Sequence, residues 1–166
     1  MLLACIAAPA TGCTNQLDSP AGQRDSMSIY AFIDAVARTS LHRHADVEAL
    51  LRQPMKLTDE NDFYRFFTLD GVQLESGMRA TNVELREPRL GTSARSALLT
   101  MAVVGNCLEA DDLAGRYPGW HLFEAPTGRS PDERISYESR VSETSVRFGF
   151  NQESPSCLVN LTFEQD

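Results

Sequence analysis

The sequence predicts an α+β domain made of an N-terminal helical hairpin and a mostly antiparallel sheet with one further helix. Apolar residues recur with a helical period in two short segments between residues 28 and 52. Most of the remaining chain is a series of short segments of β-forming residues separated by turn residues. The strongest is the apolar run Ala97–Val104, whose length and β-branched residues are typical of a buried strand.

The first helix is predicted from residue 28 to about Arg38, with Ser28 or Ser26 as its N-cap. The second covers residues 45–52, and Pro54 lies just beyond its end. A turn at residues 41–44 joins them, so we expect the two helices to pair as a hairpin. The inward residues are Ile29, Phe32, Ile33, Val36 and Ala37 in the first helix and Val47, Leu50 and Leu51 in the second.

The predicted strands follow in two groups, one on each side of the third helix. In the first group, the dipeptide Asp70 and Gly71 is typical of a turn, so we expect a strand at 63–69 and its return at 72–75. The other predicted strands are 78–87, Ala97–Val104, 120–124, Ile135–Val141, 145–150 and 157–163. Between the groups, Asn106 is the predicted N-cap of a helix that reaches Tyr117, with Glu109 completing a capping box.

The N-terminus predicts export. Residues 1–13 are apolar or small and carry no charged side chain, and a polar stretch at 14–26 follows with no apolar period. This pattern resembles the end of a bacterial lipoprotein signal peptide, which implies a mature protein anchored by lipid in the periplasm. Cys13 is the favoured lipidation site because the apolar segment precedes it, and Cys5, whose preceding residues match the family's lipobox more closely, is the alternative. The segment is short and lacks a basic residue, so either Met1 is a misassigned start and the true leader is longer, or the segment is not a signal. A short buried N-terminal helix is the interpretation in the second case, although Pro9 disfavours it.

The folded part is then one domain at residues 27–166, and its charge restricts its partners. The formal net charge is −8, which makes nucleic acid an unfavourable partner and a basic protein an easier one. From residue 108 onward there are eleven Asp or Glu against five Arg. We therefore expect an acidic binding rim that includes Asp111, Asp112, Asp132 and Glu133, with Trp120 and His121 as the adjoining aromatic group. The competing interpretation of Trp120 is core packing.

Cys107 and Cys157 are the two cysteines of the folded part. In an exported protein such a pair predicts a disulfide, which is the interpretation we favour. Buried thiols and a nucleophilic Cys107 are the alternatives, and the nucleophile would need a neighbouring base.

His42, His44 and Asp46 have a spacing that could hold zinc, although Arg38 and Arg43 beside them favour a polar turn between helices. The acidic run at residues 58–62 lacks the ligand pattern of a calcium-binding EF-hand, so it is interpreted first as a solvated loop and second as a protein-binding rim.

No phosphate-cradling glycine loop, nucleophile elbow or zinc-protease motif is present in the sequence, so we predict neither a cofactor nor an enzyme. The favoured function is a lipid-anchored envelope protein that binds another protein, similar in general character to immunity and inhibitor lipoproteins that neutralise secreted toxins. A structural lipoprotein that assists assembly of a larger complex is the alternative. A small periplasmic enzyme using His42, His44 or Cys107 is the third.

Overall fold

The computed structural model describes residues 26–130, 133–152 and 157–166. The predicted leader, with Cys5 and Cys13, lies outside the described residues, as does nearly all of the predicted tether. Asp132 of the predicted acidic rim also lies outside them.

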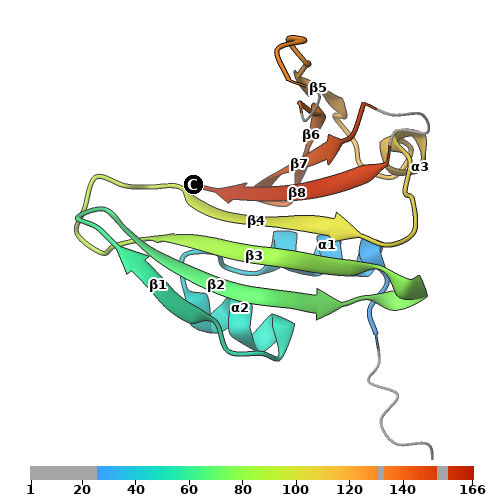
Figure 1. Ribbon diagram of the computed structural model, residues 1–166. Coiled ribbons are helices and arrows are strands. Elements are labelled where there is room, and N and C mark those ends of the chain that lie inside the picture. The colour runs from blue at the N-terminus through green and yellow to red at the C-terminus, as the bar shows by residue number, and fades with distance from the viewer. Residues whose placement is uncertain (1–25, 131–132, 153–156) are drawn as a thin grey trace, which may run out of the picture.

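Eight strands form one sheet in which every neighbouring pair is antiparallel, in the order β1-β2-β3-β4-β8-β7-β6-β5 (Figure 1). The chain therefore lays down one half of the sheet from an edge inward, crosses to the other edge, and closes at the β4–β8 pair. The predicted α+β class is confirmed. The strands are β1 Lys56–Glu60, β2 Tyr64–Gln73, β3 Arg79–Pro88, β4 Ala97–Val104, β5 His121–Glu124, β6 Ile135–Val141, β7 Thr144–Phe150 and β8 Leu158–Gln165.

Helices α1 (Ile29–Arg38) and α2 (His44–Leu51) lie where the sequence placed helices, but a helical hairpin is not supported. The apolar stripe of α1 faces the sheet, and Thr144 of β7 donates a buried hydrogen bond of 2.7 Å to the carbonyl oxygen of Ala37. Helix α2 has eight residues and buries only Val47 and Leu51. Both helices lie against the same face of the sheet (Figure 1).

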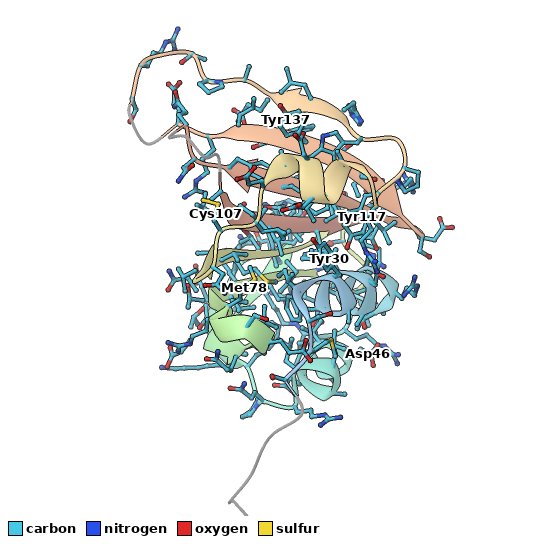
Figure 2. All side chains as sticks on the ribbon, turned by 90° about the vertical axis from the view of Figure 1, so that its right-hand side faces the viewer. Tyr30, Asp46, Met78, Cys107, Tyr117 and Tyr137 are labelled. Carbon is cyan, nitrogen blue, oxygen red and sulfur yellow. A yellow bond between two sulfur atoms is a disulfide. The ribbon has the colours of Figure 1, made fainter. Side chains whose placement is uncertain are left out.

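The core fills the space between one face of the sheet and the helices (Figure 2). Strand β4 shows the alternation that a half-buried strand requires, because Ala97, Leu99, Met101 and Val103 are buried and their neighbours are not. Phe148, Phe150 and Phe163 are fully buried at the centre, and each side chain contributes about 1.5 to 3 kcal/mol by leaving water. The opposite face, called the outer face below, has no helix over it in the described part of the chain (Figure 1).

The predicted turn at Asp70 and Gly71 is wrong, because β2 runs straight through both residues and ends at Gln73. The chain reverses instead at a short 3-10 turn, Glu75–Gly77. Gly71 allows β2 and β3 to lie close together. A Cβ atom built at Gly71 would lie 2.4 Å from the carbonyl oxygen of Ala80 on β3. A glycine is therefore needed where two backbones approach closely. The sequence also missed β1, which pairs with β2 and was interpreted as part of an acidic loop.

The predicted start of the third helix is also wrong. Helix α3 covers Ala110–Ala114, and its N-cap is Glu109, which forms a capping box with Asp112. Asn106 instead donates a side-chain hydrogen bond of 2.7 Å to the carbonyl oxygen of Ser76. The residues between them are extended, since Glu109 forms a β-bridge with Cys157 and the amide of Leu158 donates to the carbonyl of Leu108 at 2.9 Å. Because residues 108 and 109 pair with residues 157 and 158, helix α3 begins only at Ala110.

Candidate functional site

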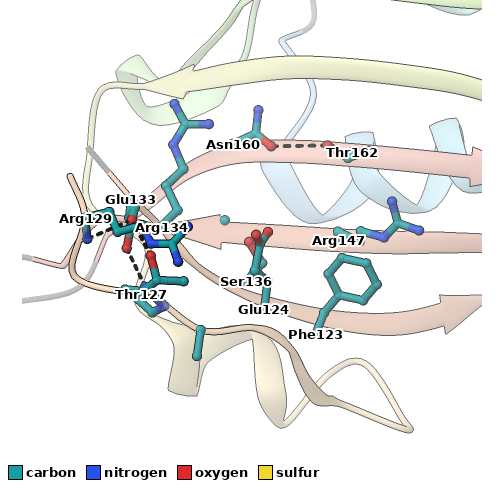
Figure 3. Close-up of a pocket in the computed structure, with 13 residues that line it drawn as sticks. Phe123, Glu124, Thr127, Arg129, Glu133, Arg134, Ser136, Arg147, Asn160 and Thr162 are labelled. Carbon is teal, nitrogen blue, oxygen red and sulfur yellow. Dashed lines mark hydrogen bonds between the residues drawn. The ribbon is translucent and has the colours of Figure 1, made fainter. Parts of the chain in front are cut away.

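A polar hollow of about 570 Å³ lies on the outer face, between the sheet and residues 123–129 and 133–134 (Figure 3). Gly149 lies at its wall, where an added Cβ would come within 3.2 Å of Asn160 and 3.5 Å of the Arg134 side chain. Arg147 is neutralised by Glu138, at 2.9 Å, and by Glu164. Arg129 and Arg134 also line the hollow, together with Glu124 and Glu133, so side chains of both signs contribute to it.

Glu133, predicted as part of the acidic rim, lines this hollow and forms hydrogen bonds within the loop that borders it. Its carboxylate accepts hydrogen bonds from the backbone amides of Thr127, Gly128 and Arg129 and from the Thr127 hydroxyl. These donors lower the pKa of Glu133, with the Thr127 contact as the largest cause. The Glu133 carboxylate is therefore satisfied by donors of its own loop.

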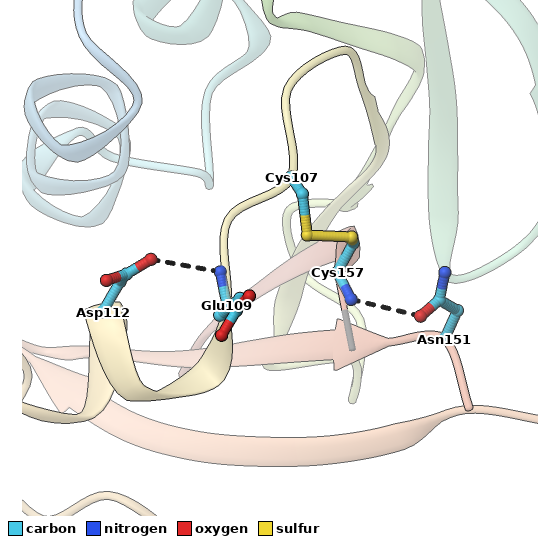
Figure 4. Close-up of a disulfide and its surroundings, with 5 residues drawn as sticks. All are labelled: Cys107, Glu109, Asp112, Asn151 and Cys157. Atoms are coloured by element: carbon cyan, nitrogen blue, oxygen red, sulfur yellow. Dashed lines mark hydrogen bonds between the residues drawn. A yellow bond between two sulfur atoms is a disulfide. The ribbon is translucent and has the colours of Figure 1, made fainter. Parts of the chain in front are cut away.

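Cys107 and Cys157 form the predicted disulfide, with their Cα atoms 5.0 Å apart (Figure 4). The bond joins the segment that enters α3 to the start of β8. Asn151 supports the same corner, because its side-chain oxygen accepts from the Cys157 amide at 3.1 Å. Both sulfurs are consumed in the bond, so neither provides the thiolate that a catalytic cysteine requires.

The aromatic group around Trp120 belongs to the apolar side of the sheet. The Trp120 ring stacks on Tyr137 at 5.1 Å and contacts Phe148 at 4.9 Å, while Tyr117 contacts Phe148 at 5.2 Å. Trp120 is partly buried and packs against the core, as the competing interpretation proposed. His121 is exposed, and its ring lies 2.8 Å from the carbonyl oxygen of Gly119.

The predicted acidic rim is divided. Asp111 is exposed on α3, and Asp112 beside it caps the same helix by accepting from the Glu109 amide at 3.3 Å (Figure 4). Glu133 lies in the loop over the outer face (Figure 3). The described members of the set therefore do not form one continuous acidic surface. The sequence could not predict this separation, because it does not show which side of the sheet each residue occupies.

The predicted metal residues are held apart by other partners. Asp46 forms an ion pair with Arg43 at 2.6 Å, and His44 stacks on Phe67 with ring centroids 4.2 Å apart. Within the described ranges, no group of three or more His, Cys, Asp or Glu is arranged to hold a metal ion, and His42 joins none.

His44 and Glu87 form a feature that the sequence did not predict. Glu87 is 3% exposed, and its carboxylate accepts from the His44 backbone amide at 2.8 Å, contacts the His44 ring at 2.9 Å and pairs with Arg65. A carboxylate can orient a histidine as a base, but no hydroxyl or thiol among the described residues is hydrogen-bonded to His44. The contact instead caps α2, because the side chain of the N-cap residue Arg43 makes no capping hydrogen bond to the helix backbone.

The tip of the β1–β2 hairpin combines acid with exposed apolar surface. We define the hairpin tip as residues 59–63 together with Leu57, which lies further along β1 opposite Phe67. Leu57 and Phe63 are 47% and 49% exposed, and the carboxylates of Asp59, Glu60 and Asp62 form no ion pair with any described residue. The sequence contained this signal as the acidic run at 58–62, for which a protein-binding rim was only the second interpretation.

The hairpin tip is also ordered by its own hydrogen bonds. The Asn61 side-chain oxygen accepts from the amides of Phe63 and Tyr64 at 2.9 and 2.8 Å. Arg89 donates to the backbone carbonyls of Asn61 and Phe63 at 2.9 and 2.8 Å. The exposed side chains thus project from a fixed backbone.

Within the residues that the structure describes, no helix is both long enough and apolar enough to cross a membrane. No protein-family model, curated protein or solved structure matches this chain.

Proposed function

We propose that this protein is an exported, lipid-anchored binding protein of the bacterial envelope that captures a basic protein partner through its hairpin tip. The observation that carries the proposal is the pairing of two exposed apolar side chains, Leu57 and Phe63, with three unpaired carboxylates on one ordered hairpin. Interfaces commonly combine apolar anchors with a charged rim that steers the approach of the partner.

The partner is basic because the hairpin tip carries more acid than base. Arg89 is bonded to the backbone there, yet three carboxylates remain beside it. The net charge of −8 attracts the same class of partner from a distance. The order of the hairpin adds affinity, because little conformational entropy is lost when it binds.

The disulfide supports the location. Disulfides persist in oxidising compartments such as the bacterial periplasm and are rare in the cytosol. Together with the lipoprotein-like leader, the Cys107–Cys157 bond is consistent with an envelope protein. An inhibitor or immunity protein against a secreted toxin is the particular function we propose, since such a protein works by binding rather than by catalysis.

The location is tested by mass spectrometry of the protein recovered from a bacterial host with the upstream reading frame restored. The expected product is acylated at Cys13, or at Cys5 as the alternative. A product in the cytosol with an intact, unmodified Met1 would contradict export.

Binding is tested by capture from host envelope extract at low and high salt, followed by identification of the captured protein and kinetics with that purified protein. The triple variant D59K/E60K/D62K is expected to slow association at least tenfold and to flatten its salt dependence, while F63A speeds dissociation. The control D111K/D112K makes two such charge reversals on α3, against three at the hairpin tip, and should affect association by much less than that ratio of charge.

The outcomes separate the hypotheses. If D111K/D112K slows association more than D59K/E60K/D62K does, the interface lies at α3, as the acidic rim predicted from the sequence would require. Capture that does not change with salt concentration, or capture of acidic partners only, would contradict the hypothesis that the partner is basic. A basic toxic enzyme as the captured protein supports the inhibitor function, and a structural envelope component supports the assembly alternative.

A further inference from the structure

A further exposed apolar side chain lies beside the hairpin tip, at the turn that joins β3 to β4. Leu90 is 102% exposed, more than any other large apolar residue that the structure describes. Its side chain therefore contributes no burial to the stability of the fold. A lone exposed leucine is ordinary on a protein surface, and the position of Leu90 next to Phe63 is what makes it informative.

Leu90 stands at the apex of an ordered turn. Residues 89–92 form this turn, which we call the leucine turn. The Thr92 amide and hydroxyl both donate to the carbonyl oxygen of Arg89, at 3.4 and 2.9 Å. Gly91 has a φ of +80°, the left-handed region that the third residue of a type II turn requires. The backbone thus holds Leu90 at the surface in a fixed place.

Two hydrogen bonds join the leucine turn to the hairpin tip. The Arg89 amide donates to the carbonyl oxygen of Phe63 at 2.8 Å, and the Arg89 side chain donates to that of Asn61 at 2.9 Å. These bonds extend the pairing of β2 with β3 beyond its last strand residues. Both turns lie at the same end of the sheet (Figure 1). Phe63 and Leu90 are therefore neighbouring projections from one bonded unit.

The two turns lie far from the place where the chain enters the domain. The carbonyl oxygen of Met27 accepts from the Glu75 amide at 3.0 Å, just beyond the last residue of β2, whereas residues 59–63 precede its first residue. Strand β2 has ten residues, and such a strand spans roughly 30 Å. An anchor at the N-terminus therefore leaves this end of the molecule open to a partner.

The two turns differ in charge. The hairpin tip carries the three unpaired carboxylates, whereas residues 88–96 contain Arg89 and Arg95 and no Asp or Glu. Attraction of a basic partner therefore comes from the hairpin tip, and Leu90 offers apolar contact without adding to that attraction. The two contributions should consequently appear in different rate constants, the carboxylates in association and Leu90 in dissociation.

We infer that Phe63 and Leu90 are paired anchors, and that the hairpin tip and the leucine turn together enter a concave apolar surface bordered by basic groups on the partner protein. A side chain that projects from a turn is fully removed from water only when the partner surrounds it, and a flat surface covers one side of it. Interface anchors contribute most when they fill such desolvated pockets. This inference rests on the proposed function, to which it adds a second anchor and the shape of the partner's surface.

The test is photo-crosslinking of the full-length protein in its bacterial host. Phe63, Leu90 and Leu122 are replaced one at a time by the photo-reactive residue benzoylphenylalanine, and the adducts are identified by mass spectrometry. Leu122 is the matched control, because it is 52% exposed and lies on β5, at the other edge of the sheet. Positions 63 and 90 should crosslink to the same basic protein, through two different segments of that protein, and position 122 should give little adduct.

The crosslinks separate failure of this inference from failure of the proposed function. If position 63 gives an adduct and position 90 gives no more than position 122, the second anchor is refuted and the proposed function stands. If neither position exceeds position 122, both are refuted. An adduct at position 90 alone, or different proteins at positions 63 and 90, would overturn the paired anchors and the hairpin tip as the main site.

Binding kinetics with the purified crosslinked protein provide the second measurement. L90A should speed dissociation about tenfold and leave the association rate and its salt dependence within about twofold of the wild type. L122A should change neither rate. Since the Leu90 side chain is fully exposed, L90A should keep the melting temperature of the wild type, so its effect reports binding rather than folding. An unchanged dissociation rate in L90A, alongside faster dissociation in F63A, would overturn the inference.

Discussion

Removing the disulfide should destabilise the domain by about 4 kcal/mol. The bond closes a chain segment with a sequence separation of 50 residues, and the chain-entropy model gives about 4 kcal/mol for a loop of that size. The folded state should survive the double substitution C107A/C157A, because the Glu109–Cys157 bridge and the Leu108–Leu158 hydrogen bond are made by backbone atoms. The loss therefore comes mainly from the greater freedom of the unfolded chain.

Urea unfolding of the purified domain, followed by tryptophan fluorescence, measures this loss. The wild type and C107A/C157A should differ by about 4 kcal/mol in unfolding free energy and by about 10 °C in melting temperature. Reducing agent should lower the wild type toward the variant and leave the variant unchanged, which is the internal control. A difference below about 1 kcal/mol would show that the bond constrains little, and free, alkylatable thiols at both positions in native periplasmic protein would refute the bond itself.

Three further predictions concern single side chains. Gly71→Ala should cost at least about 2 kcal/mol, since its Cβ would lie 2.4 Å from a backbone oxygen, whereas Gly115→Ala, with nothing within 4 Å of the new atom, should be nearly neutral in the same urea assay. Glu87→Ala should cost about 1 to 2 kcal/mol because it removes the hydrogen bond that caps α2 at the His44 amide, and the exposed Glu84→Ala on the same strand is the control; equal effects would contradict the buried network. The pKa of Tyr117 is raised by burial to about 12, so the unfolded chain loses this proton first, and the contribution of Tyr117 is complete below pH 10 and lost as the pH rises toward 12. Stability should fall by about 1.4 kcal/mol more in the wild type than in Tyr117→Phe between pH 8 and pH 11, and parallel curves for the two proteins would count against this cause.

The sequence was most informative where a segment had a single strong period. Ala97–Val104 and Ile135–Val141 have the predicted bounds, and the stripe of α1 buries the predicted residues. Alternation and helical spacing are local properties, so they can be recognised without knowing what covers the segment. The failures occurred where distant contacts overrode local preference, as at Gly71, which resembles a turn residue and instead allows β3 to approach.

The same distinction between local pattern and distant contacts applies to the candidate sites. By itself the sequence determined the α+β class, the acidic charge, the pairing of the two domain cysteines and the presence of an acidic run before Phe63. Only the tertiary structure decided that this run forms the ordered hairpin tip, that Trp120 packs on Phe148, and that Glu87 accepts from His44. Charge and periodicity belong to each residue and its neighbours along the chain, whereas a binding site depends on which strands pair and which face of the sheet the helices cover.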